Sequence, residues 1–275
     1  VEVTCLGLCP ASNCLLVDIN PGPRILVDCP LEAAGLAYFP VARTGGAEGG
    51  GLNVNVEGNG SGFLHTAQLG AVDPSTLDCV IITNFHNMLA LPYITESAAG
   101  FNGVVLATEP TAHLGKLLIQ EISDYISSSS VSSAAEKSKS SHVSQEKGPG
   151  SLLLGPSRRP YTMEQAASAC SKILSLNFAQ SHNLMGGFVF TPYSSGLCLG
   201  SANWLIASST VKVAVLGGSA IANPKRHPLP LQFSALSHVD VAIVGDLLPR
   251  DRAPWPAQPP ASAEQQAGAA AGGIQ

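Results

Sequence analysis

Apolar residues along this chain are grouped in short runs that turn-forming residues separate. Two such runs, at 14–19 and 24–28, flank the segment Asn-Pro-Gly-Pro at 20–23, and this arrangement is typical of a β-hairpin. The runs at 77–83 and 104–107 are continuously apolar, as expected for strands that are covered on both faces. The pattern therefore predicts a buried sheet in this part of the chain.

Helical features follow these runs. Pro110 can begin a helix that reaches about residue 125, because apolar residues follow at helical spacing: Leu114, Leu117, Leu118 and Ile122. Thr162 and Gln165 resemble a capping box for a second helix that reaches about Ile173. A short helix is also expected at 89–94, near Pro92.

More strand candidates follow the second helix in quick succession: 173–178, 187–191, 203–207, 211–216 and 239–244. Strands that alternate with helices indicate the α/β class. We expect one domain over 1–247, with a flexible Gly-rich loop at 44–62 and a disordered Ser-rich insert at 127–150. A low-complexity tail is expected at 248–275, because this segment is rich in Pro and Ala.

Composition narrows the classes of function. The chain has 275 residues, of which 45% are hydrophobic and 12% charged, and its net charge is −5. This balance favours a packed core and argues against a strongly basic surface for nucleic acid. It does not exclude a local basic patch. No apolar run reaches the roughly 18 residues that a membrane span needs.

The start of the sequence and its cysteines suggest a compartment in which thiols stay reduced. The sequence starts without Met and without the basic segment of a signal peptide, which suggests that it begins inside a longer product. Its seven cysteines are an odd, widely spaced set, so we expect free thiols. A metal site at Cys5, Cys9 and Cys14 is kept as a weaker alternative.

Residues 81–93 form the most informative segment. They read Ile-Ile-Thr-Asn-Phe-His-Asn-Met-Leu-Ala-Leu-Pro-Tyr. This segment resembles the metallo-β-lactamase-fold nucleases of the β-CASP family, which carry His-x-His-x-Asp-His there, often followed by Ala-Leu-Pro. In those enzymes the ligands hold two zinc ions that activate a water molecule. The resemblance implies an αββα sandwich, of which this chain would hold only the first part.

The overlay also shows where this chain departs from the nucleases. The first His falls on Asn84, the second is kept as His86, the Asp falls on Met88 and the last His on Leu89. The later ligand positions fall on three more residues, which are Ser194, Leu197 and Ser219. Only His86 is a conventional ligand, whereas zinc needs three or four donors.

We therefore expect a degenerate site without catalytic residues, metal or cofactor, in a pseudoenzyme. A one-metal remnant at His86 is a weaker alternative to a hydrogen-bonded loop residue. Asp28, at a strand end, is expected to hold the loop by hydrogen bonds. A serine hydrolase at Ser194-Ser195 is disfavoured, because no supporting His and Asp are evident.

Further segments narrow the resemblance: 84–96, 107–111, 159–163, 192–196 and 199–204. They are similar to the non-catalytic, Integrator-type members of the family. This implies a nuclear scaffold that forms a heterodimer with the catalytic Integrator nuclease subunit and contacts other Integrator subunits. The assembly would process small nuclear RNA and nascent transcripts, and RNA contact would come through the complex, without a membrane. Two alternatives are the non-catalytic 100-kilodalton-type subunit of the cleavage and polyadenylation factor and, less favoured, a metallohydrolase with unusual ligands.

Overall fold

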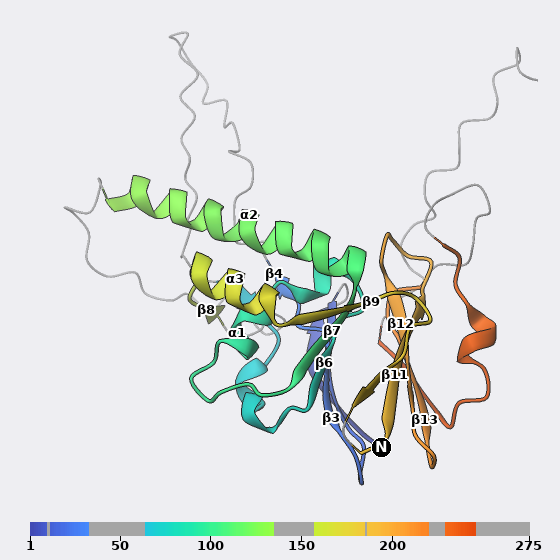
Figure 1. Ribbon diagram of the computed structural model, residues 1–275. Coiled ribbons are helices and arrows are strands. Elements are labelled where there is room, and N and C mark those ends of the chain that lie inside the picture. The colour runs from blue at the N-terminus through green and yellow to red at the C-terminus, as the bar shows by residue number, and fades with distance from the viewer. Residues whose placement is uncertain (10–11, 33–63, 135–156, 185, 220–228, 246–275) are drawn as a thin grey trace, which may run out of the picture.

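The computed structural model describes residues 1–9, 12–32, 64–134, 157–184, 186–219 and 229–245. The expected loop at 44–62 and the expected tail at 248–275 lie outside these residues. Two stacked sheets form the centre of the fold, as Figure 1 shows. The α/β class and the two packed sheets that the family resemblance implied are confirmed.

The first sheet has six strands in the order β1-β2-β3-β6-β7-β9. Strand β2 pairs antiparallel with β1 and with β3, whereas β3, β6, β7 and β9 pair parallel with one another in that order. Their bounds are Glu2–Cys9, Ser12–Asp18, Arg24–Val27, Cys79–Ile81, Val104–Thr108 and Ile173–Leu176. Parallel neighbours need crossover connections, and the helices of this fold lie in those connections.

The second sheet has five strands in the order β10-β11-β12-β13-β14. All neighbours are antiparallel except β13 and β14. Their bounds are His182–Leu184, Phe188–Ser194, Ala202–Ala207, Lys212–Leu216 and Val241–Val244. A small third sheet joins β4 (Leu31–Glu32), β5 (Leu64–Thr66) and β8 (Ser157–Arg158).

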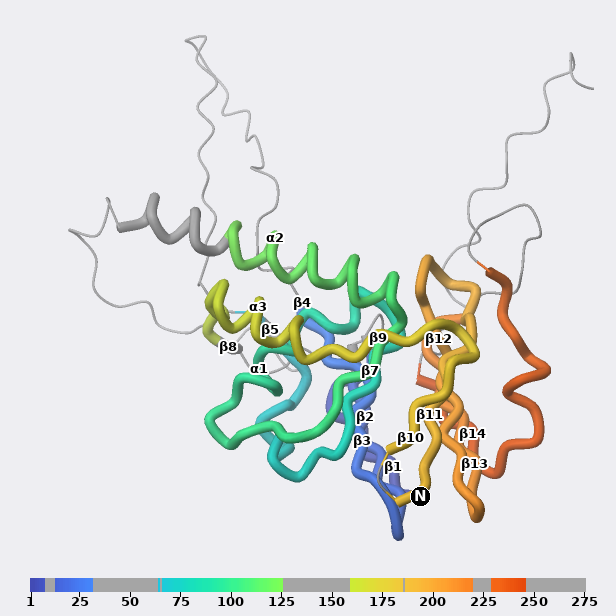
Figure 2. The backbone as a smooth tube through the Cα atoms, in the orientation of Figure 1, coloured from blue at the N-terminus to red at the C-terminus, as the bar shows by residue number. Residues whose placement is uncertain are grey.

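Three α-helices lie on the outer side of the six-stranded sheet in the described part of the chain: α1 (Leu91–Thr95), α2 (Glu109–Ala134) and α3 (Met163–Ser171). The backbone tube in Figure 2 shows α2 and α3 stacked along this face. Short 3₁₀ helices complete the fold: η1 (Leu69–Ala71), η2 (Pro74–Thr76), η3 (Phe85–Met88) and η5 (Phe233–Leu236). No helix among the described residues is long and apolar enough to cross a bilayer.

Two apolar cores explain why the central strands are apolar at every position. Successive strand residues point to opposite faces, so Leu26 and Val80 pack under the helices while Ile25 and Ile81 pack between the two sheets. Trp204 fills the inter-sheet core without exposed surface, and its Nε1 donates to the Ile82 carbonyl at 3.0 Å. The central strands β3, β6 and β7 are therefore covered on both sides.

The predicted hairpin, the buried strands and the capped helix are confirmed. Thr162 Oγ1 accepts from the Gln165 backbone N–H at 3.2 Å, and Gln165 Oε1 accepts from the Thr162 backbone N–H at 2.9 Å. The expectation of disorder from residue 127 is wrong for 127–134, because α2 continues to Ala134. An established helix gains one hydrogen bond for each residue that it adds, so it can extend into a polar segment. Residues 135–150 lie outside the described part.

Candidate functional site at the sheet edge

The polar site residues follow strands that end at one edge of the two sheets. Asp28 follows β3, and Thr83 and Asn84 come shortly after β6. The second sheet lies directly against this point, because the Ala202 N–H donates to the Thr83 carbonyl at 2.7 Å. A Cβ atom at Gly217 would lie 2.9 Å from the Thr83 Cβ. Glycine at 217 thus lets the loop after β13 contact the end of β6.

Asp28 is the centre of a buried hydrogen-bond network. Its Oδ1 accepts from the Thr83 backbone N–H at 2.7 Å, and its Oδ2 accepts from Thr83 Oγ1 at 2.7 Å and Asn87 Nδ2 at 2.9 Å. The residue is 4% exposed. Its φ of 61° is left-handed, which Asp tolerates better than most residues. The expectation that Asp28 holds the loop by hydrogen bonds is confirmed.

Asn84 begins the loop at the position of the first zinc ligand. Its Oδ1 accepts from the backbone N–H groups of His86 at 3.0 Å and Asn87 at 3.3 Å, and so caps η3. Its Nδ2 donates to Thr83 Oγ1 at 3.3 Å. Both polar atoms of the Asn84 amide are therefore committed to the fold of the loop itself.

His86, Met88 and Leu89 point in different directions although they are close in sequence. His86 is exposed, whereas Met88 and Leu89 are buried in the core beneath the helices. A Cβ atom at Gly115 of α2 would lie 1.9 Å from Met88 Sδ, so the thioether packs directly on that glycine. Met88 and Leu89 both pack in the core beneath the helices, and neither lines the cavity between Asp28, Thr83 and Gly217.

The serines at the end of β11 bond to segments that lie between the strands of the second sheet. Ser194 Oγ donates to the Leu229 carbonyl at 2.6 Å, and Ser195 Oγ lies 2.6 Å from Ser201 Oγ. Leu197, in the following loop, is 45% exposed. These partners are a carbonyl and a hydroxyl, neither of which can act as the general base of a serine nucleophile.

Asn203 is a site residue that the sequence analysis missed. It is fully buried on β12, and its Oδ1 accepts from the Gly217 N–H at 3.0 Å. Its Nδ2 donates to Ser219 Oγ at 3.0 Å. Asn203 therefore ties the loop that carries Ser219 to the strand next to Ser194. A polar residue in the apolar run Ala-Asn-Trp-Leu-Ile was the available signal, since a buried amide needs hydrogen-bond partners.

These residues do not fit a two-zinc centre. In the described part of the chain, no three His, Cys, Asp or Glu side chains lie close enough together to hold a metal ion. The Asp28 carboxylate already accepts three hydrogen bonds. The cavity between Asp28, Thr83, Asn87 and Gly217 measures about 10 Å³, about the space of one water molecule.

The side chain of Cys9 lies outside the described part of the chain, and among the described side chains no group of three metal ligands includes Cys5 or Cys14. Cys5 is exposed on β1, while Cys14 of β2 faces the core. Burial, followed by the negative charge of Asp28, raises the pKa of the Cys14 thiol. A neutral buried thiol of this kind behaves as a small apolar side chain.

Comparison with known proteins agrees with this architecture. A model described as the metallo-β-lactamase superfamily domain matches residues 69–216. Integrator complex subunit 9 of Homo sapiens is 39% identical over 185 residues, which are 64% of this chain and 27% of that protein. The Integrator complex subunit 9 homolog of Nematostella vectensis is 28% identical over 279 residues, with 89% of this chain and 40% of that protein covered.

Two more distant proteins also match. Cleavage and polyadenylation specificity factor subunit 3-I of Arabidopsis thaliana is 28% identical over 159 residues, 57% of this chain and 19% of that protein. The solved structure of Rm3 metallo-β-lactamase has a TM-score of 0.40 and 13% identity, with 88% of this chain and 74% of that chain covered. The chain thus spans well under half the length of its curated relatives. The match of the superfamily domain to over half of the residues shows that the chain belongs to the metallo-β-lactamase superfamily.

Proposed function

We propose that this chain is part of a non-catalytic scaffold subunit of an Integrator-type complex, paired with the catalytic nuclease subunit in the nucleus. The observation that carries the proposal is the 39% identity to Integrator complex subunit 9 over 185 residues. In this proposal the two-sheet domain is retained as a rigid body for assembly. The assembled complex, with the partner's active site, would process small nuclear RNA and nascent transcripts.

The chemistry of the sheet edge supports a non-catalytic role. A catalytic zinc site needs about three protein donors and an open position for water. Here the side chains at the expected positions are one imidazole, an amide, hydroxyls and apolar groups, and Asn84 and Ser194 are bonded to loop backbone. The loops are held by bonds between side chains and backbone, which removes the need for a metal to order them.

A non-catalytic subunit of the cleavage and polyadenylation factor is the second candidate. The 28% identity to subunit 3-I of the Arabidopsis factor supports a relationship to that factor, without distinguishing among its subunits. The higher identity to Integrator complex subunit 9 favours the first candidate. RNA contact is assigned to the complex, because a chain with a net charge of −5 lacks the strongly basic character of RNA-binding domains.

Affinity purification of the tagged full-length protein from its own nuclei separates these candidates. We expect the catalytic Integrator nuclease subunit in near-stoichiometric amount, with other Integrator subunits. Recovery of cleavage and polyadenylation factor subunits instead would favour the second candidate.

An RNA cleavage assay tests the absence of activity. The purified protein should cleave no RNA with added Zn²⁺, and Asn84→His should not create activity, because the other donors are still missing. Zinc-dependent cleavage that His86→Ala abolishes would overturn the non-catalytic role.

A further inference from the structure

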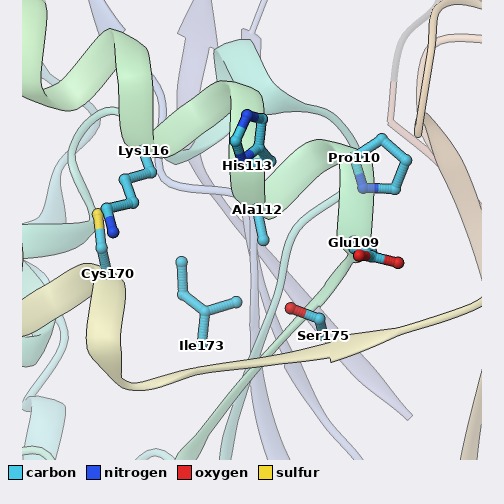
Figure 3. A pocket seen from close by; sticks show the side chains of 8 residues that line it. All are labelled: Glu109, Pro110, Ala112, His113, Lys116, Cys170, Ile173 and Ser175. Carbon is cyan, nitrogen blue, oxygen red and sulfur yellow. The ribbon is translucent and has the colours of Figure 1, made fainter.

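An open groove lies on the helix side of the fold, away from the degenerate site. It is about 450 Å³ in volume, within the range of pockets that hold ligands. The first turns of α2 form one wall, and the end of α3 with β9 forms the other, as Figure 3 shows. Ile173 and Ser175 of β9 face Ala112 and His113 of α2 across it.

Strand β9 is the last strand of the six-stranded sheet. It pairs with β7 on one side, and no other described strand pairs with its opposite side. Leu174, whose side chain points to the other face of the sheet, is 38% exposed. An unpaired edge presents a row of backbone donors and acceptors that another extended segment can bind.

The groove carries one charge of each sign on the same wall. Glu109 and Lys116 both line it, and they are seven residues apart on α2, which places them on one face about 10.5 Å apart along the axis. Neither forms an ion pair with another described residue. In an extended peptide, side chains on one face repeat about every 6.8 Å, so residues two positions apart can approach both charges.

We infer that the groove between α2 and β9 is a docking site for an extended segment of a partner protein. The segment adds to the sheet beside β9, and its side chains enter the groove on alternate residues. An acidic side chain pairs with Lys116, and a basic side chain two positions away pairs with Glu109. Backbone bonds to β9 provide affinity, and the two charges select the segment, as in other cases of strand addition.

Binding of short strand-forming peptides to the 275-residue chain tests this inference without any Integrator subunit. The probes are fluorescein-labelled Thr-Val-Lys-Val-Glu-Val-Thr, the peptide with Lys and Glu exchanged, and a neutral peptide with Gln at both positions. We expect one charged order to bind more tightly than the neutral peptide by fluorescence anisotropy. Hydrogen exchange should then slow in the segment 172–177.

Charge reversal provides the control. Lys116→Glu should weaken the preferred peptide about threefold to tenfold, since an exposed pair contributes up to about 1 kcal/mol and reversal adds repulsion. Replacing the peptide Glu by Lys should restore binding to Lys116→Glu. The matched variant Lys212→Glu, on β13 of the other sheet, should bind as the parent does. Absence of saturable binding, or equal binding by Lys116→Glu, or unchanged exchange at 172–177, would each overturn the inference.

Discussion

Replacing Asp28 by Asn tests whether a carboxylate network holds the site loop. The variant keeps the shape of the side chain, and Asn also tolerates the left-handed backbone at φ 61°. It removes the negative charge and turns one oxygen into a donor. The Thr83 N–H requires the remaining oxygen, so the new NH₂ group faces Thr83 Oγ1 and Asn87 Nδ2.

The size of the effect follows from these bonds. A hydrogen bond to a charged group contributes about 1.5–3 kcal/mol, and a buried donor without a partner adds its own desolvation cost. Loss of the bonds at Oδ2 should therefore lower the free energy of unfolding by about 3–5 kcal/mol. For a domain of this size, that corresponds to a Tm lower by roughly 6–20 °C.

Thermal and urea unfolding, followed by circular dichroism, measure this change. The matched control is Asp18→Asn. Asp18 forms a part-exposed ion pair with Arg24 Nε at 3.1 Å, and such a pair contributes at most about 1 kcal/mol. If Asp28→Asn were as stable as Asp18→Asn, the network would not hold the loop and the reasoning would fail.

Three further substitutions test other parts of the account. Gly115→Ala should destabilise the protein by about 1–3 kcal/mol through the clash with Met88, but not in a Met88→Ala background. A double-mutant cycle without coupling would contradict the packing of Met88 against Gly115. Asn203→Ala should cost about 1–3 kcal/mol, because the Gly217 N–H and Ser219 lose their buried partner, whereas the exposed Asn183→Ala should have little effect in the same urea titration. Burial opposes the ionised form of Glu96, but hydrogen bonds from Lys172, Thr95 and Ser168 outweigh the effect of burial and lower the pKa of Glu96. The bonded carboxylate therefore stabilises the fold above the unfolded pKa of about 4.3. This contribution is lost as the pH falls through the folded pKa. Unfolding from pH 6 to 3 should show a shallower acid loss in Glu96→Gln, by less than about 1 kcal/mol, and parallel curves would contradict the assignment.

The central strands could be predicted because both of their faces are covered. In the continuous apolar runs around Val80 and Val105, alternate side chains point to opposite faces of the sheet. One set packs in the core beneath the helices and the other in the core between the sheets. Strands β1 and β10 were missed for the opposite reason. Most side chains of Glu2–Cys5 on β1 are exposed, and β10 has only three residues, so neither leaves a clear periodic pattern.

The site could be predicted only in part. The resemblance to the family predicts that Asn84, Ser194 and Ser219 stand at former ligand positions, but it could not give the direction of Met88. That direction depends on the 3₁₀ turn Phe85–Met88 and on the space left by Gly115, a contact between segments far apart in sequence. The role of Asn203 likewise depends on the loop after β13, which the spacing of residues does not show.

The zinc content of the purified protein tests the central claim most directly, namely that hydrogen bonds at the sheet edge replace the metal centre of the family. The protein is incubated with excess Zn²⁺, dialysed, and measured by elemental analysis beside the His86→Ala variant. We predict well under one zinc per chain in both proteins. One zinc or more per chain in the parent, lost in His86→Ala, would contradict the claim.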